Sequence, residues 1–108
     1  MSADQFRMTA FMTAMKQGLD GALAASVALA LHPFDDSPIP GREFEKQVRA
    51  LSQEFAMDVR KLSDKQEPIR ALTVQTLESY RTLAIELGEQ YYIDRYDPAI
   101  DKLSPSSE

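Results

Sequence analysis

Residues 22–31 read ALAASVALAL, and Ser26 is the only polar side chain in this stretch of the 108-residue chain. A segment of this kind is a membrane span, a cleavable export signal, a buried core helix or a surface that a partner covers. A helix of this length is about 15 Å long, whereas a bilayer core measures about 30 Å. The segment is therefore too short to span a membrane.

An export signal is also a poor match to these residues. Ala28, Leu29 and Ala30 have the small-x-small pattern of a cleavage site. However, the stretch before them is too long for an ordinary positively charged leader, and it contains Asp4 and Asp20. A buried helix and a partner surface remain as the two better interpretations.

The segment is apolar on two opposite sides. At 100° per residue, one stripe is formed by Leu19, Leu23, Val27 and Leu31. Leu29 points almost the opposite way, among alanines. A helix that is apolar all round must be covered all round, and a short chain offers few elements to do so. We therefore expect a second subunit to cover one side.

The first residues predict a separate helix. Ser2 is a suitable N-cap, and Gln5 follows at the spacing of a capping box. Gly18 and Gly21 then weaken helical structure by about 1 kcal/mol each relative to alanine. We expect the chain to break or bend at these glycines.

The clearest loop is residues 33–41, which contain three prolines and Gly41. The strongest helix signal follows it, because six apolar side chains fall within roughly 80° of one another on the helical wheel. They are Phe44, Val48, Leu51, Phe55, Val59 and Leu62.

Pro68 suits the first position of a further helix. That helix has one stripe from Ile69 to Leu87 and a second, which includes Val74 and Ile85, rotated by about 150°. The sequence leaves open whether it ends at Gly88 or continues into residues 91–96. Residues 98–108 are expected to form an irregular tail, because Pro98 should stop regular structure.

These patterns predict a single all-α domain over residues 1–108, with three or four helices, that forms a homodimer. The two-sided helices supply the candidate dimer interface. Its expected residues are Leu23, Val27, Leu31, Val74 and Ile85.

Composition excludes several classes of partner. The chain has 12 basic and 17 acidic residues, a net charge of −5, and no cysteine. Nucleic acids and anionic membrane surfaces both attract basic proteins, so neither is an expected partner. Without cysteine there are no disulfides, thiolate metal sites or cysteine nucleophiles, and a reducing, cytoplasmic location fits.

No catalytic, cofactor-binding or metal-binding motif is present. The sequence contains no HExxH, Glu-x-x-His, P-loop or GxGxxG pattern. The only histidine, His32, is followed by Asp35 and Asp36, which together could form an acid–base or metal cluster. We favour the interpretation that all three belong to a solvated loop.

Methionines near the start suggest a partner surface. The residues of this surface are three methionines and one phenylalanine: Met8, Phe11, Met12 and Met15. Methionine is flexible and polarizable, which suits adaptable binding surfaces, although the same side chains also fill cores. The total apolar area exceeds the need of one small core, so we predict that this face binds a partner protein.

The whole chain resembles the QslA family of small quorum-sensing antiactivators. The resemblance lies in the length, the acidity, the absence of cysteine and QFRMTAFMTAM (residues 5–15) before ALAASVALAL. It implies a helical, non-enzymatic protein that binds a LuxR-type regulator and blocks its dimerisation and DNA binding. It assigns no individual contact residue.

Two other functions remain open at this point. One is a helical structural or phage-type assembly module. The other is a small all-α metabolite isomerase, for which Arg42, Arg49 and Arg70 would be the candidate binding residues. An enzyme of this type needs a closed polar pocket, whereas a binding protein needs an exposed apolar patch.

Overall fold

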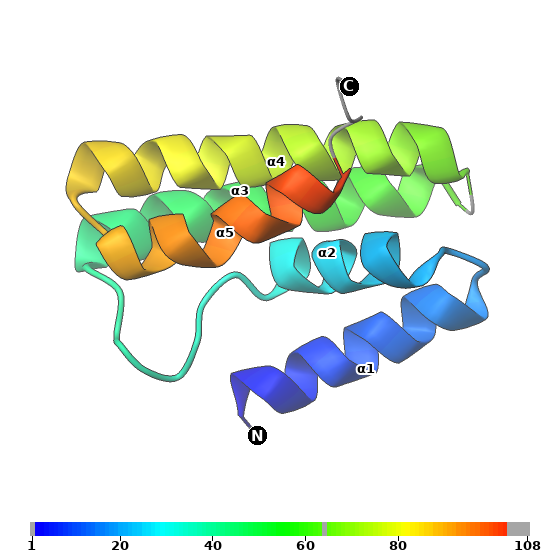
Figure 1. Cartoon of the computed structure of the whole chain (residues 1–108), viewed down its shortest axis with the longest axis horizontal. Helices are drawn as coiled ribbons and strands as arrows, with labels where there is room; N and C mark the ends of the chain where they lie inside the picture. Colours follow the sequence, from blue (N-terminus) through cyan, green and yellow to red (C-terminus); the bar gives the residue numbers. More distant parts are fainter. Residues whose placement is uncertain (1, 64, 104–108) are drawn as a thin grey trace.

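A computed structural model describes residues 2–63 and 65–103, and within them the backbone forms five α-helices and no β-strand (Figure 1). The helices are α1 (Ala3–Lys16), α2 (Gly21–Leu31), α3 (Arg42–Lys61), α4 (Gln66–Leu87) and α5 (Gln90–Leu103). The all-α prediction is confirmed. The predicted number of three or four helices is wrong, because the residues after Gly88 form a further helix.

The chain breaks between α1 and α2, where the glycines predict it. Ser2 caps α1 by accepting a hydrogen bond from the Gln5 backbone, and the Gln5 side chain accepts one in return. After Lys16, Gly18 takes a φ of 97°, a left-handed conformation that glycine adopts without strain. Asp20 then caps α2, since its carboxylate accepts from the Leu23 backbone at 2.9 Å.

The expected irregular tail is wrong for residues 98–103, because α5 contains Pro98 and continues to Leu103. Pro98 lacks the N–H that would bond to the carbonyl of Asp94. A buried face stabilises the helix despite that loss. Its members recur at helical spacing: Tyr92, Tyr96, Ile100 and Leu103. Residues 104–108 of the expected tail lie outside the described residues.

The apolar helix α2 lies at the centre of the molecule. It contacts α1, α3, α4 and α5, and Figure 1 shows it between α1 and the other helices. Leu23, Ala24 and Ala30 have no exposed surface. We expected a second subunit on the premise that a short chain offers too few elements to cover this helix. That premise is wrong, since one chain supplies enough helices to cover α2. The homodimer itself stays a prediction.

Helices α3 and α4 pack side by side, and Figure 1 shows α5 in front of α3. The predicted α3 stripe faces the core, with Phe44, Val48 and Phe55 buried and its other members partly buried against the same cluster. From α4, Leu77 and Tyr80 are fully buried. Helix α2 packs against α3, α4 and α5, and α1 in turn packs against α2.

Candidate functional site

The last turn of α2 and the loop between α2 and α3 are held to the core by three buried tyrosines. Each hydroxyl donates a hydrogen bond of 2.7 Å to a backbone carbonyl: Tyr80 to Ala30, Tyr96 to Pro33 and Tyr92 to Pro38. Burial raises the pKa of the Tyr80 and Tyr96 hydroxyls above the ordinary value, so both remain protonated donors. The loop is therefore fixed, although it has no regular structure.

Arg7 of α1 holds this loop from the other side. Its Nε donates to the carbonyl of His32 at 2.8 Å, and one terminal nitrogen donates to the carbonyl of Phe34 at 2.7 Å. The other terminal nitrogen lies 2.5 Å from the Asp35 carboxylate. An arginine that is only 8% exposed therefore joins α1 to the loop.

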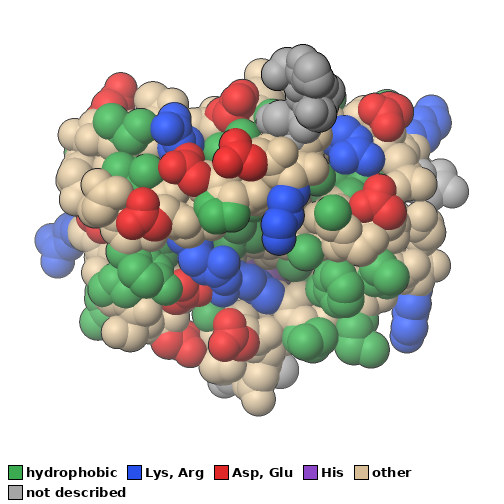
Figure 2. Space-filling view, in the orientation of Figure 1, with side chains coloured by type: hydrophobic (Ala, Val, Ile, Leu, Met, Phe, Trp, Pro, Cys, Tyr) green, Lys and Arg blue, Asp and Glu red, His purple; other side chains and the backbone are tan. Residues whose placement is uncertain are grey.

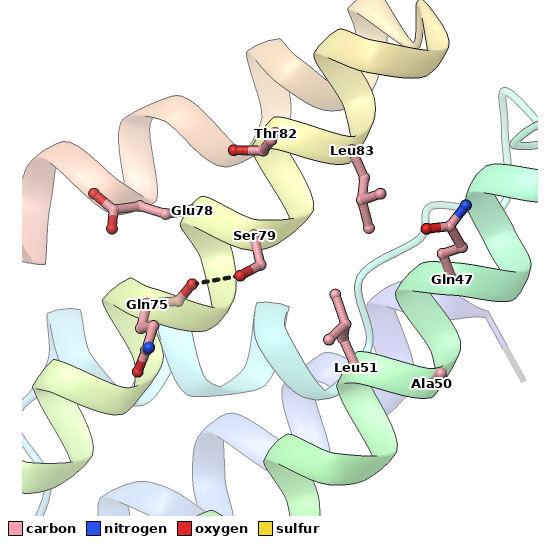
Figure 3. A pocket seen from close by; sticks show the side chains of 8 residues that line it. All are labelled: Gln47, Ala50, Leu51, Gln75, Glu78, Ser79, Thr82 and Leu83. Carbon is pink, nitrogen blue, oxygen red and sulfur yellow. Dashed lines mark hydrogen bonds between the residues drawn. The ribbon is translucent and has the colours of Figure 1, made fainter.

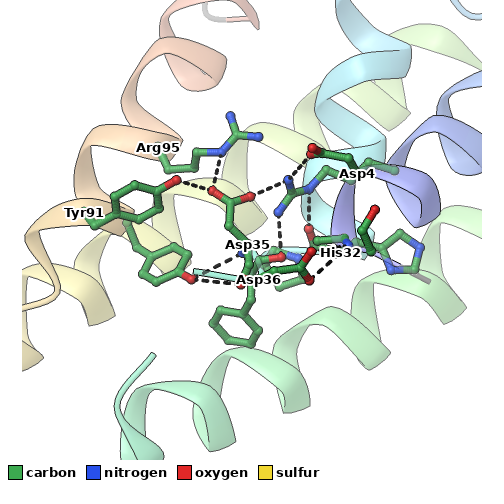
Figure 4. Close-up of polar contacts among 12 residues, drawn as sticks. Asp4, His32, Asp35, Asp36, Tyr91 and Arg95 are labelled. Atoms are coloured by element: carbon green, nitrogen blue, oxygen red, sulfur yellow. Dashed lines mark hydrogen bonds and ion pairs between the residues drawn. The ribbon is translucent and has the colours of Figure 1, made fainter. Parts of the chain in front are cut away.

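Asp35 is the centre of this network, which we call the Asp35 clamp: Arg7, Asp35, Tyr91 and Arg95. The second carboxylate oxygen of Asp35 accepts from the Tyr91 hydroxyl and from Nε of Arg95 at 3.1 Å (Figure 4). Burial alone would raise the pKa of Asp35. The hydrogen bonds from Tyr91 and Arg7 and the charges of both arginines outweigh burial and hold the pKa below its ordinary value.

The interpretation of residues 32–36 as a solvated loop is wrong for Asp35, whose side chain is 15% exposed. Asp36 is exposed, and its carboxylate accepts from the Ala3 backbone at the start of α1. The ring of His32 stacks on Phe6 at 5.5 Å, and burial, followed by the charge of Arg7, lowers its pKa. These residues fasten α1 rather than form a cluster open to solvent.

The Asp35 clamp is poorly suited to catalysis. A carboxylate held ionised between two guanidinium groups is a weak base, and its oxygens are already occupied. Among the residues that the structure describes, no group of three or more His, Asp or Glu side chains could hold a metal ion. The chemistry available here is that of a structural tie.

The outer surface of α1 is the unusual feature of the molecule. The buried residues of this helix are Arg7 and Ala14, while Met8, Met12 and Met15 are 57%, 53% and 44% exposed. These methionines together with Phe11, which is partly buried against the core, are called the methionine face. The helix thus buries one arginine and one alanine and leaves three large apolar side chains about half exposed.

A groove of about 760 Å³ lies beside this face, between α1 and α5, and is called the α1–α5 groove. Met8 and Phe11 line it from α1, Ala22 and Ala25 from α2, and Arg95 and Ala99 from α5. Figure 2 shows the hollow between the two helices, with Lys and Arg side chains at its centre and apolar side chains beside it. A groove lined by both apolar and charged side chains thus adjoins the methionine face.

The predicted dimer residues do not gather on one surface. Leu23 and Val27 are 0% and 5% exposed inside the chain, so neither can meet a second copy, and that part of the assignment is corrected. Leu31 and Val74 are partly buried against the core. Ile85 alone among the five is well exposed, at 51%.

A second, shallower hollow of about 580 Å³ lies between α3 and α4 (Figure 3). Ala50 and Leu51 of α3 face Ser79 and Leu83 of α4 across it. The Ser79 hydroxyl donates to the carbonyl of Gln75 one turn earlier, at 3.1 Å. This hollow brings no group of charged side chains together.

The three arginines of the isomerase hypothesis are also not brought together. Arg42 begins α3, whereas Arg70 lies near the start of α4 and pairs with Asp20 at 3.3 Å. Arg49 pairs with Glu45, and its guanidinium lies over the ring of Phe34 at 5.3 Å. None of five cavities found among the described residues is lined by two of the three arginines.

Comparison with known proteins finds no matching family model, no matching curated protein and no matching solved structure. Within residues 2–63 and 65–103, none of the helices combines the length and apolar character that crossing a bilayer requires. The site must therefore be interpreted from its own geometry.

Proposed function

We propose that this chain is a non-enzymatic protein-binding module that covers an apolar surface of another protein through the methionine face of α1. The observation that carries the proposal is the inverted distribution of side chains on that helix. Met8, Met12 and Met15 are each about half exposed, whereas Ala14 and Arg7 are buried.

Single exposed apolar residues are ordinary, but a contiguous group is not. Met8, Met12 and Met15 are spaced by four and three residues, so they lie on one side of the helix. Methionine and phenylalanine are enriched in interface cores, and methionine adapts its shape to different partners. Packing within the chain covers only about half of each of these side chains, so a large apolar area remains on this side of the helix.

The proposed action is inhibition by occlusion of a transcriptional regulator. The choice of a LuxR-type regulator rests on the resemblance to QslA-type antiactivators, which block dimerisation of their target. An exposed apolar surface on a small helical domain supports occlusion, because it can occupy the surface through which a regulator would dimerise. The same surface would serve an assembly module, and the identity of the bound protein separates the two functions.

The test is capture of a purified LuxR-type regulator by the immobilised chain, with Met12→Glu as the disrupting variant. Met57→Glu is the matched control, since Met57 is 62% exposed on α3 and lies outside the methionine face. We expect the wild type and Met57→Glu to retain the regulator and Met12→Glu to lose it. Equal capture by both variants would contradict the assigned surface, and no capture by the wild type would contradict the regulator as partner.

A further inference from the structure

We propose that the α1–α5 groove binds an amphipathic α-helix of the partner, and that Arg95 binds a carboxylate on that helix. This inference rests on the proposed function, because it names the part of a partner protein that lies beside the methionine face. Three features of the groove support it: its shape, the geometry of Arg95 and the distribution of charge along α5.

The groove has the shape of a helix-binding site. α1 packs against α2 and against no other helix within the described residues, which leaves the space between α1 and α5 open. The floor is made by Ala22 and Ala25, both exposed and both small. Packed helices lie about 8–10 Å apart, and small side chains at the contact allow the closer end of that range. Met8 and Phe11 form one apolar wall.

Arg95 has donors available for a ligand. In the described part of the chain it donates one hydrogen bond, from Nε to Asp35. Its terminal nitrogens point away from Asp35 (Figure 4). A guanidinium group has five N–H donors, and its two terminal nitrogens can bind one carboxylate through two parallel hydrogen bonds.

The position of Arg95 is fixed before any partner arrives. Asp35, to which it bonds, is itself held by Arg7 and Tyr91. A binding group already held in place loses less conformational freedom on association, which favours affinity. The Asp35 clamp thus has a second consequence, because it orients a cation at the edge of the groove.

Charge along α5 defines where a partner's acidic residues would lie. Lys102 also lines the groove, two turns beyond Arg95 and about 10 Å away along the helix. Asp4 and Asp94 line it as well and disfavour carboxylates opposite them. The groove therefore suits a helix with an apolar stripe and two acidic residues about two turns apart.

The experiment uses a labelled amphipathic peptide of about 18 residues, roughly five helical turns. Its apolar stripe is leucine, and two glutamates two turns apart flank the stripe. A matched peptide has glutamine at both positions. Fluorescence anisotropy should show saturable binding to the full chain, with the glutamate peptide binding about tenfold more tightly, as expected for a charge-assisted hydrogen bond. Equal affinity of the two peptides, or no binding of either, would overturn the proposal.

Two variants test the site itself. Arg95→Gln should reduce binding of the glutamate peptide by about tenfold and leave the glutamine peptide unchanged, whereas Arg42→Gln, an equal change of charge on α3, should affect neither. Ala25→Leu should fill the groove and weaken the binding of both peptides. Ala71→Leu, on the exposed side of α4, is its control. Since Ala25 is exposed, this second variant keeps the test valid if Arg95→Gln disturbs the clamp.

Failure of this inference is distinguishable from failure of the proposed function. Capture of the regulator that is lost in Met12→Glu but unchanged in Arg95→Gln and Ala25→Leu would leave the methionine face as the binding surface and overturn the groove. Loss of capture in all three variants, with the three control variants unaffected, supports the groove as part of the same interface.

Discussion

Replacing Asp35 with asparagine should destabilise the protein by about 2–3 kcal/mol at neutral pH. Asparagine keeps the shape of the side chain but removes the negative charge between Arg7 and Arg95. Hydrogen bonds to charged groups contribute about 1.5–3 kcal/mol each, and removing the charged partner of a buried group leaves its desolvation uncompensated. Arg95 is 38% exposed, so most of the effect should come from Arg7, whose side chain is 10% exposed.

The effect should depend on pH in a defined direction. Because the pKa of Asp35 is lowered in the folded state, its ionised form contributes stability above its ordinary value of 3.8. That contribution is lost as the pH falls through the folded-state pKa. The wild type should therefore lose stability in acid faster than Asp35→Asn, and the difference between them should shrink there.

The assay is thermal unfolding followed by circular dichroism at pH 7 and at pH 3. For a domain of this size, the expected loss corresponds to a decrease in Tm of about 10 °C at neutral pH. Asp94→Asn is the control, because Asp94 is exposed and should change stability by less than about 0.5 kcal/mol. A decrease no larger than that of the control, or one independent of pH, would refute the clamp and restore the solvated-loop interpretation.

Two other substitutions test the packing. Val27→Glu places an unpaired carboxylate in the core, at a cost of several kcal/mol, and should unfold the chain. Met12→Glu changes an exposed side chain and should leave the Tm within about 3 °C of wild type. If both variants unfold to the same extent, the methionine face is part of the core. Pro98→Ala should raise the free energy of unfolding by about 1–3 kcal/mol in urea titrations, because alanine restores the hydrogen bond to Asp94 inside α5; a decrease would show that the proline ring packs favourably there.

Helical periodicity predicted most of the fold. The six apolar positions from Phe44 to Leu62 face the core as their spacing requires, and the glycines and Asp20 separate α1 from α2. Helix α5 was not predicted, because two signals in this segment conflict. Pro98 forbids one hydrogen bond, but burial of Tyr92 and Tyr96 on one face stabilises the helix by more than that loss. Tertiary burial therefore decided the structure of residues 90–103.

The Asp35 clamp was not predictable from spacing near the loop. Arg7 lies 28 residues before Asp35 and Arg95 lies 60 residues after it, so no local motif joins them. One signal was present in YYIDRY, residues 91–96, where Tyr91 and Arg95 are spaced to share a helical face. That pattern indicates a polar cluster, but only the packing of α1 and α5 around the loop identifies its carboxylate.

The predicted homodimer now has to rely on a different surface. Since α2 is covered within one chain, a second copy must meet residues that remain exposed. Ile85, 51% exposed near the end of α4, is the one member of the predicted interface that remains well exposed, and it lies outside the methionine face. A two-fold interface is self-complementary, so one substitution there acts on both copies.

We therefore expect light scattering at micromolar concentration to give twice the chain mass of 12.1 kDa. Ile85→Glu should return the protein to monomers, because it places two carboxylates at the same interface. Met12→Glu should remain dimeric. A wild-type monomer at high concentration would refute the dimer. If Met12→Glu instead produces the monomer, the methionine face holds the two copies together, and partner binding and dimerisation must then compete for the same surface.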